Sequence, residues 1–221
     1  MIDYVIPGNI DTRVLKRAAS ALREGAVAAL PTETTWITAC ALNSGIGIKK
    51  LRALSGERDE RHFTLLCSKI SQFSNYCEID NQRFRLINKH MPGPFVFILK
   101  TLHGTEKTLG LKRRELGVRI PEHTVPRALI DTLGEPLYTI TAKRSMLKDE
   151  NQIEYEEDDE NELHLIPEAE LFESAVEMLD IKGIDLVLDS GEELQRCFST
   201  VIDLTGTNAR ILRKGAGVFP E

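Results

Sequence analysis

The sequence contains no apolar run that approaches the ~20 residues of a membrane-spanning helix. Its first residues, Met1-Ile2-Asp3-Tyr4, lack the basic start and apolar centre of a secretory signal peptide. We therefore expect a cytoplasmic protein with no membrane partner. A chain of 221 residues with 42% hydrophobic residues fits one large globular domain or two small ones.

The sequence also lacks the residue spacings of a metal site. The cysteines contain no CxxC pair, and the five histidines are scattered. We expect reduced, mostly buried thiols rather than disulfides or a zinc site, and no structural metal. The thiols in question are Cys40, Cys67, Cys77 and Cys197.

Basic residues are missing from one stretch, residues 149–162, which reads DENQIEYEEDDENE and holds nine carboxylates. Removing these nine charges from the net charge of −6 leaves a mildly basic body of +3. Like charges repel and resist packing, so the stretch is typical of a solvated loop inserted into the domain. A lid that screens a basic cleft is the alternative.

Alternating apolar patterns indicate an α/β protein. Asp11 is suited to cap a helix over residues 12–24, and Gly25 to stop it. Because several strands follow one another with short connections, we predict a single domain over residues 1–221 with a twisted, mixed β-sheet and helices packed on it. Further helices are expected at 46–55, from Asp80 to about residue 91, at 125–133 and from Pro167 to about residue 179, and strands at 26–30, 36–42, 63–67, 95–100, 117–120, 137–141, 184–188, 200–204 and 210–213.

The segment Pro31-Thr32-Glu33-Thr34-Thr35-Trp36 directly follows the apolar strand 26–30. Proline cannot donate a hydrogen bond to a sheet, so strand pairing should stop at Pro31. Hydroxyls, a carboxylate and a large aromatic then gather at a strand end, where open α/β sheets bind ligands. An ordinary turn between strands is the simpler interpretation.

Four other motifs follow in a fixed order: Pro92-Gly93-Pro94 before an apolar strand, Gly117-Val118-Arg119-Ile120-Pro121, Ser199-Thr200-Val201-Ile202-Asp203, and Leu212-Arg213-Lys214-Gly215-Ala216. Together with the strand-end segment, this order resembles the YrdC/YciO family, over about residues 10–217. The resemblance implies a YrdC-like fold with a large basic cavity.

The family's best-understood members are threonylcarbamoyl-AMP synthases. The resemblance therefore implies a nucleotidyltransferase that joins ATP, L-threonine and bicarbonate, with Mg²⁺ bound to ATP. Pyrophosphate leaves, and the product serves the modification of adenosine 37 in tRNA. Such chemistry needs cations around the triphosphate and a space shielded from water.

Two arginines are the best candidates for phosphate binding. Arginine offers a planar fork of donors that suits phosphate, and Arg119 lies between a buried strand and a proline. The resemblance places Arg213 near the nucleotide phosphate. Ser199 and Thr200 open a strand with hydroxyls and backbone N–H groups that we expect to be free to meet phosphate oxygens. The alternatives are a structural ion pair for Arg119, a solubilising edge charge for Arg213 and a turn hydroxyl for Ser199.

The resemblance places Thr32 and Thr34 in the threonine pocket and among the nucleotide contacts. Trp36 stands where a Tyr is usual, and its ring is expected either to wall the pocket or to pack in the core. No residue is singled out as catalytic.

Two family signatures are altered. The Lys-x-Arg signature falls on Ser55-Gly56-Glu57, although Arg58 lies one position further and is a candidate replacement. The Ser-x-Asn signature falls on Thr141-Ala142-Lys143, where the hydroxyl is kept and Lys143 is a candidate phosphate contact. These changes favour the YciO-like branch. They leave open a second interpretation, a drifted member that binds nucleotide, tRNA or double-stranded RNA without turnover.

Overall fold

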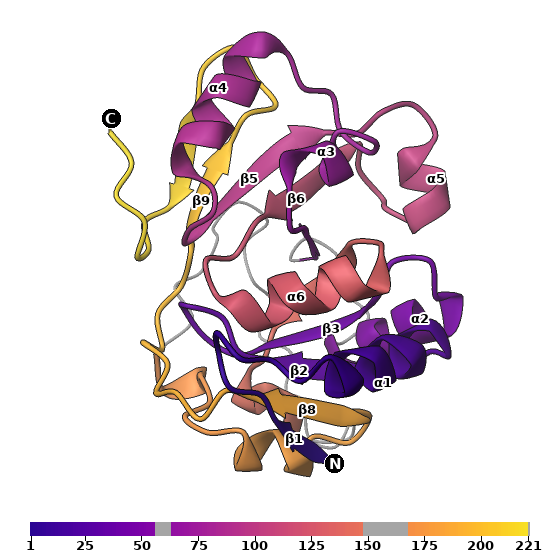
Figure 1. The fold of residues 1–221 in the computed structure, drawn as a ribbon. Coiled ribbons are helices and arrows are strands. Elements are labelled where there is room, and N and C mark those ends of the chain that lie inside the picture. The colour runs from indigo at the N-terminus through magenta and orange to yellow at the C-terminus, as the bar shows by residue number, and fades with distance from the viewer. Residues whose placement is uncertain (56–62, 148–167, 221) are drawn as a thin grey trace.

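The computed structural model describes residues 1–55, 63–147 and 168–220. Its described residues form a ten-stranded sheet in the order β1-β8-β2-β3-β7-β4-β6-β5-β9-β10, with helices around it (Figure 1). Parallel and antiparallel pairs alternate irregularly, so the sheet is mixed, as predicted. The strands are β1 (Ile2–Tyr4), β2 (Ala28–Leu30), β3 (Ile37–Ala41), β4 (Thr64–Leu66), β5 (Phe95–Lys100), β6 (Glu115–Arg119), β7 (Leu137–Thr141), β8 (Leu186–Asp189), β9 (Thr200–Asp203) and β10 (Arg210–Arg213).

The helices follow the predicted pattern in four places and add two short elements. Helix α1 begins where predicted, because Asp11 accepts a hydrogen bond from the Arg13 N–H at 2.8 Å, and it ends one residue before its C-cap Glu24. The α-helices are α1 (Thr12–Arg23), α2 (Gly45–Ser55), α3 (Ile70–Phe73), α4 (Asn81–His90), α5 (Thr105–Leu109) and α6 (Thr124–Leu133).

The core lies on both faces of the sheet. Helices α1 and α6 pack side by side on one face, over β2, β3 and β8 (Figure 1). A larger cluster on the other face includes residues of α2, α4, β4, β5 and β6. β7 contributes to both clusters, because Leu137 faces the first and Tyr138 the second.

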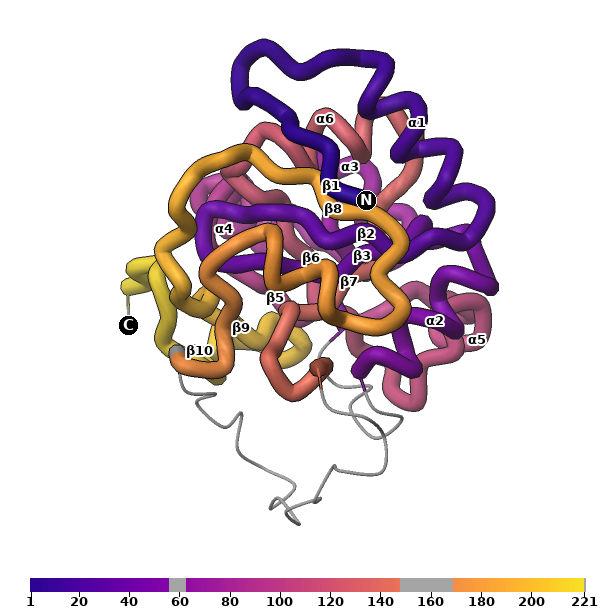
Figure 2. Tube along the Cα trace, turned by 90° about the horizontal axis from the view of Figure 1, so that it is seen from below, coloured from indigo at the N-terminus to yellow at the C-terminus, as the bar shows by residue number. Residues whose placement is uncertain are grey.

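The two ends of the described chain lie at opposite edges of the sheet, with β1 at one edge and β10 at the other (Figure 2). A third cluster packs Trp36 of the β2–β3 connection against Phe172, Met178 and Ile181. It ties the segment before β8 to the strand-end motif.

The structure differs from the sequence predictions in three respects. The helix predicted up to residue 179 is instead two short 3₁₀ helices in its described part, η4 (Glu168–Glu170) and η5 (Val176–Asp180). β1 was not predicted, because its partner β8 is more than 180 residues away and its three residues carry little local pattern. α3 and α5 were missed for the same reason of length. The acidic stretch 149–162 lies outside the described residues.

Candidate functional site

The strand-end segment forms a closed turn of hydroxyls. β2 ends at Leu30, directly before Pro31, as predicted. The Thr32 hydroxyl donates to the Thr35 carbonyl at 2.7 Å and accepts the Thr35 N–H at 3.2 Å. It also lies 3.0 Å from the Thr34 hydroxyl, and both threonines are fully buried. The turn therefore satisfies its own backbone and is fixed in shape.

Arg119, the last residue of β6, reaches this turn. Its Nη2 donates to Glu33 Oε1 at 2.8 Å and to the Thr34 hydroxyl at 3.0 Å. The residue is 5% exposed, yet its Nε has no hydrogen-bond partner among the described residues. A buried guanidinium with a spare donor is costly to leave unsatisfied and is suited to an incoming anion.

Glu33 is held from two sides. Its Oε1 accepts from Arg119, and its Oε2 accepts the backbone N–H groups of Glu122 at 3.1 Å and His123 at 3.4 Å, just before α6. Burial acts to raise the pKa of the Glu33 carboxyl, but the Arg119 charge and these hydrogen bonds outweigh it and hold the pKa below its ordinary value. Glu33 is therefore an anion that fixes Arg119.

The pairing register of the strands brings a second arginine to the end of the sheet where Arg119 lies. Phe97 of β5 lies opposite Val118 of β6, and Phe95 lies opposite Thr200 of β9, so the end of β6 and the start of β9 are close. Arg213, at the end of β10, donates through Nε and Nη2 to the Ser199 carbonyl at 3.2 and 3.1 Å, and its guanidinium lies 4.9 Å from the Phe198 ring centre.

Arg213 differs from Arg119 in having no carboxylate partner among the described residues. Burial, together with the positive charge of Arg119, lowers the pKa of Arg213 to about 10. Arg213 is still a cation at neutral pH. Among the described residues, one carboxylate, that of Glu33, contacts these two guanidinium groups, which leaves the pair short of negative charge.

The Gly215 and Gly217 positions explain why the last motif needs glycine. The Gly215 N–H donates to the Thr200 hydroxyl at 3.0 Å, and the hydroxyl donates to the Gly217 carbonyl at 2.6 Å. A Cβ on Gly215 would lie 2.2 Å from the Phe198 carbonyl oxygen. The segment after β10 thus lies directly against the residues that hold Arg213.

The two hydroxyl residues at the start of β9 differ in how far their polar groups are already hydrogen-bonded. The backbone N–H of Thr200 donates to Pro94, and its hydroxyl is occupied by the segment after β10, so Thr200 is not free to meet a phosphate. The Ser199 hydroxyl forms no hydrogen bond with any residue that the structure describes. Of these two hydroxyls, only that of Ser199 remains available.

The remaining predicted residues lie around the start of β3. Trp36 is 1% exposed and packs in the third cluster, so the structure favours the core interpretation, and its indole N–H has no partner among the described residues. Thr141 lies opposite Ile37, and Lys143 follows two residues later with a half-buried side chain. Arg58 and part of the altered Lys-x-Arg signature lie outside the described residues.

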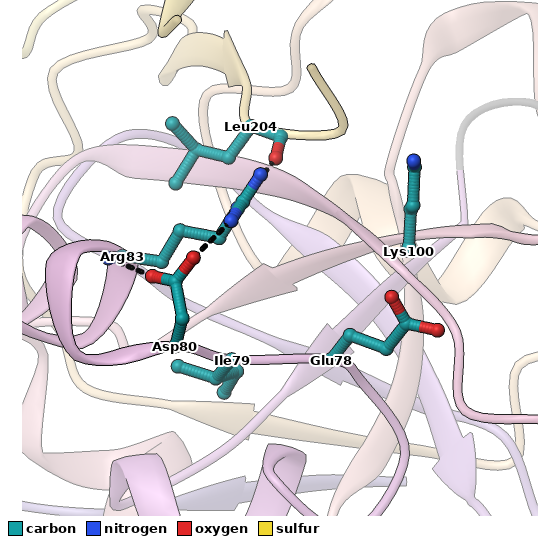
Figure 3. A pocket seen from close by; sticks show the side chains of 6 residues that line it. All are labelled: Glu78, Ile79, Asp80, Arg83, Lys100 and Leu204. Carbon is teal, nitrogen blue, oxygen red and sulfur yellow. Dashed lines mark hydrogen bonds and ion pairs between the residues drawn. The ribbon is translucent and has the colours of Figure 1, made fainter. Parts of the chain in front are cut away.

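Two pockets lined by described residues lie elsewhere. One, of about 320 Å³, lies between α4 and the end of β9, where Arg83 contacts Asp80 and the Leu204 carbonyl (Figure 3). Its acidic residues Glu78 and Asp80 balance Lys100 and Arg83, so it lacks the charge of an anion site. The other, of about 480 Å³, borders β10. Neither includes a predicted site residue, and the large basic cavity remains a prediction.

The thiols and possible metal ligands have simple structural roles. Cys40, Cys67 and Cys77 are buried, and burial raises the pKa of each thiol, to about 12 for Cys40 and Cys77. They are therefore poor nucleophiles. Among residues 1–55, 63–147 and 168–220, no group of three or more His, Cys, Asp or Glu could hold a metal ion. No helix in those ranges is both long and apolar enough to cross a membrane.

Sequence reasoning missed three residues of the site. Glu33 was noted only as a carboxylate of the motif, and neither His123 nor Glu192 was singled out. His123 Nε2 lies 3.1 Å from Glu192 Oε2. His123 follows Pro121 by two residues, and that proximity to the Arg119 motif was the signal available.

Comparison with known proteins places this geometry in a family. A family model described as "Telomere recombination", Sua5/YciO/YrdC, matches residues 20–170. The chain belongs to the Sua5/YciO/YrdC family. It is 30% identical to the uncharacterized protein YciO of Escherichia coli K12, over 97% of this chain and 95% of that one.

The crystal structure of E. coli YciO superimposes with a TM-score of 0.79 at 28% identity, covering 99% of this chain and 97% of that one. A mouse threonylcarbamoyl-AMP synthase is 28% identical over 61% of this chain and 48% of its own length. P. abyssi Sua5 complexed with L-threonine shares the fold, with a TM-score of 0.78 at 22% identity, over 97% of this chain and 57% of that one.

Proposed function

We propose that this protein is an L-threonylcarbamoyladenylate synthase or a close variant, a nucleotidyltransferase that uses ATP, L-threonine and bicarbonate. The observation that carries the proposal is the shortage of negative charge between Arg119 and Arg213. Two guanidinium groups facing one carboxylate suit a polyphosphate better than a neutral ligand.

The arginines have a chemical role in this reaction. A carbamate oxygen formed from threonine and bicarbonate attacks the α-phosphorus of ATP, and the bond to the β-phosphate oxygen breaks. Negative charge then grows on the leaving pyrophosphate. Fixed guanidinium groups stabilise that charge without reorganising, and the Ser199 hydroxyl lies where it can add a donor.

Mg²⁺ would enter on the phosphates of ATP, where it supplies charge neutralisation. Glu33 is the carboxylate that contacts Arg119, and both of its oxygens already accept hydrogen bonds. The described residues therefore do not form a resident Mg²⁺ site.

L-threonine as the amino-acid substrate is supported by the threonine complex of P. abyssi Sua5 and by the synthases among the relatives. In this chain, the hydroxyls of Thr32 and Thr34 are occupied within their own turn. We infer that they shape the pocket wall, and that Lys143 and Arg58 supply the further cations.

The altered Lys-x-Arg signature favours a second candidate function, binding of a nucleotide without turnover. Ser55 and Glu57 replace two cations of that signature, and a carboxylate near a triphosphate repels it. In this second function, Arg119 and Arg213 would still bind the phosphates, but no pyrophosphate would be released.

The test is release of pyrophosphate from ATP and Mg²⁺ in the presence of L-threonine and bicarbonate. The proposal expects release that depends on both co-substrates and is lost in Arg119→Ala. ATP binding without release with any amino acid would favour the second candidate. Absence of both binding and release would contradict the two together.

A further inference from the structure

His123 joins two parts of the site that are distant in sequence. It caps α6, because its Nδ1 accepts the Val125 N–H at 3.2 Å. With Nδ1 acting as the acceptor, the proton of the neutral ring lies on Nε2, which donates to Glu192 Oε2 at 3.1 Å. The His123 side chain is 7% exposed, so its tautomer is set by these two contacts.

Glu192 belongs to the segment 190–199, which connects β8 to β9 and leads into Ser199. This segment has no regular structure, and its attachments include Glu192 to His123, Arg196 to Glu173, and the Cys197 N–H to the Thr34 carbonyl at 3.1 Å. Arg196 has a φ of 49°, a conformation that side-chain-bearing residues rarely adopt. Such a segment depends on its attachments for its path.

The attachments connect the two arginines. One end of the segment carries the Ser199 carbonyl that accepts from Arg213, and its Cys197 contact reaches the turn that holds Arg119. On the other side, the His123 N–H donates to Glu33, the carboxylate partner of Arg119. His123 is thus linked to Arg119 through Glu33 and to Arg213 through the segment 190–199.

We propose that His123 is a positioning residue that fixes the spacing of Arg119 and Arg213 for a polyphosphate, by holding the segment 190–199 against α6. This inference rests on the proposed function, because it assigns the two arginines a shared anion. Glu192 is 54% exposed, whereas the His123 side chain is buried, so the contact has one fixed and one solvated partner.

The charges around His123 make the α6 cap respond to pH. Glu192 from the segment 190–199 and Glu33 from the β2–β3 connection face the ring and favour its charged form, whereas burial disfavours it. Protonation of Nδ1 would also set a donor against the Val125 N–H and remove the α6 cap. In the protonated ring Nε2 still donates to Glu192, so protonation removes the α6 cap but keeps the attachment of the segment 190–199.

Two substitutions separate the two contacts. In His123→Asn, the side-chain oxygen takes the place of Nδ1, so the cap is kept while the donor to Glu192 is lost. In His123→Gln, the amide nitrogen takes the place of Nε2, so the donor is kept while the cap is lost. Glu192→Gln is the matched change on the other side, because it keeps an acceptor and removes the charge.

Hydrogen-exchange protection of the Cys197 N–H and equilibrium binding of inorganic pyrophosphate are the two readouts. In the wild type, we expect protection to persist when the His123 ring is protonated, because Nε2 still donates to Glu192, and NMR follows the ring titration. His123→Asn should lose protection at every pH and bind pyrophosphate roughly tenfold more weakly, a loss typical of one charge-assisted contact. His123→Gln should keep the affinity but melt at a lower temperature.

Unchanged protection and pyrophosphate affinity in His123→Asn would overturn the proposal, as would a loss of wild-type protection when the ring is protonated and still donates to Glu192. Failure of the proposed reaction is recognised separately. In that case, the wild type would release no pyrophosphate from ATP, while the protection of Cys197 would still depend on His123.

Discussion

Arg119 and Arg213 lie at the same end of the strands but in opposite electrostatic settings. Arg119 is buried against Glu33, whereas the described contacts of Arg213 are with the Ser199 carbonyl and the Phe198 ring. A cation with a buried partner serves structure as well as binding, because removing one partner leaves the other charge buried. A cation without a partner is mainly available to a ligand. We therefore expect the two arginines to fail differently when substituted.

The largest effect is expected for Arg119→Ala. It should abolish ATP binding and, because it leaves Glu33 buried without its cation, lower the free energy of unfolding by about 3–5 kcal/mol. Urea denaturation and ATP calorimetry measure the two losses.

Arg17→Ala is the matched control for Arg119→Ala, because it breaks the more exposed ion pair with Asp3 and should change stability little. Equal stability losses in the two variants would mean that the Glu33–Arg119 pair contributes no more to the free energy of unfolding than an exposed ion pair does.

Arg213→Gln should weaken ATP binding while leaving the stability of the fold nearly unchanged. Loss of this cation, which has no carboxylate partner among the described residues, is expected to weaken ATP binding by about 1.5–3 kcal/mol, with little change in the melting temperature.

Arg210→Gln on the same strand is the control for Arg213→Gln, since Arg210 is 71% exposed and pairs with Asp203. A stability loss in Arg213→Gln as large as that of Arg119→Ala would erase the proposed difference between the two arginines.

Gly215→Ala tests the position of Arg213 by displacing the backbone beside it. The added Cβ would lie 2.2 Å from the Phe198 carbonyl oxygen, so the segment must move away from Ser199 and disturb Arg213. We expect a loss of about 1–3 kcal/mol in unfolding free energy, as for other overpacked sites, and weaker ATP binding.

The control for Gly215→Ala is Gly206→Ala, where the nearest atom is 3.9 Å from the added Cβ. If both glycine variants melt at the wild-type temperature and bind ATP normally, Gly215 does not set the position of Arg213.

The smallest effect concerns pH. Burial lowers the pKa of His123 below its ordinary value, despite the opposing charges of Glu192 and Glu33. The folded state therefore binds fewer protons there than the unfolded state, and this stabilising contribution is present above the ordinary histidine pKa and is lost as pH falls.

Urea denaturation between about pH 7.5 and 5.5 should show a smaller stability loss for His123→Asn than for the wild type. Parallel pH profiles for the two proteins would contradict this assignment.

The sequence predicted what local pattern controls. Asp11 and Gly25 marked the ends of α1, and Pro31 marked the end of β2. The motif order also pointed to Arg119, Arg213 and Ser199, which the structure brings to the same end of the strands. The substrate and nucleotide roles of Thr32, Thr34, Thr141, Lys143 and Arg58 stay predictions.

The parts that escaped prediction depend on long-range contacts. Glu33 and Arg119 are 86 positions apart, and His123 and Glu192 are 69 apart, so no local pattern links them. Histidine is also an unusual N-cap, and its role at α6 becomes visible only from the Val125 hydrogen bond. Gly215 was part of the motif, but its close approach to Phe198 required coordinates.

Calorimetric titration of ATP with Mg²⁺, with and without L-threonine and bicarbonate, tests the central claim most directly. If Arg119 and Arg213 form a polyphosphate site for adenylate transfer, the wild type should bind ATP, and threonine with bicarbonate should tighten binding and release pyrophosphate. Failure of the wild type to bind ATP under any of these conditions would contradict the claim.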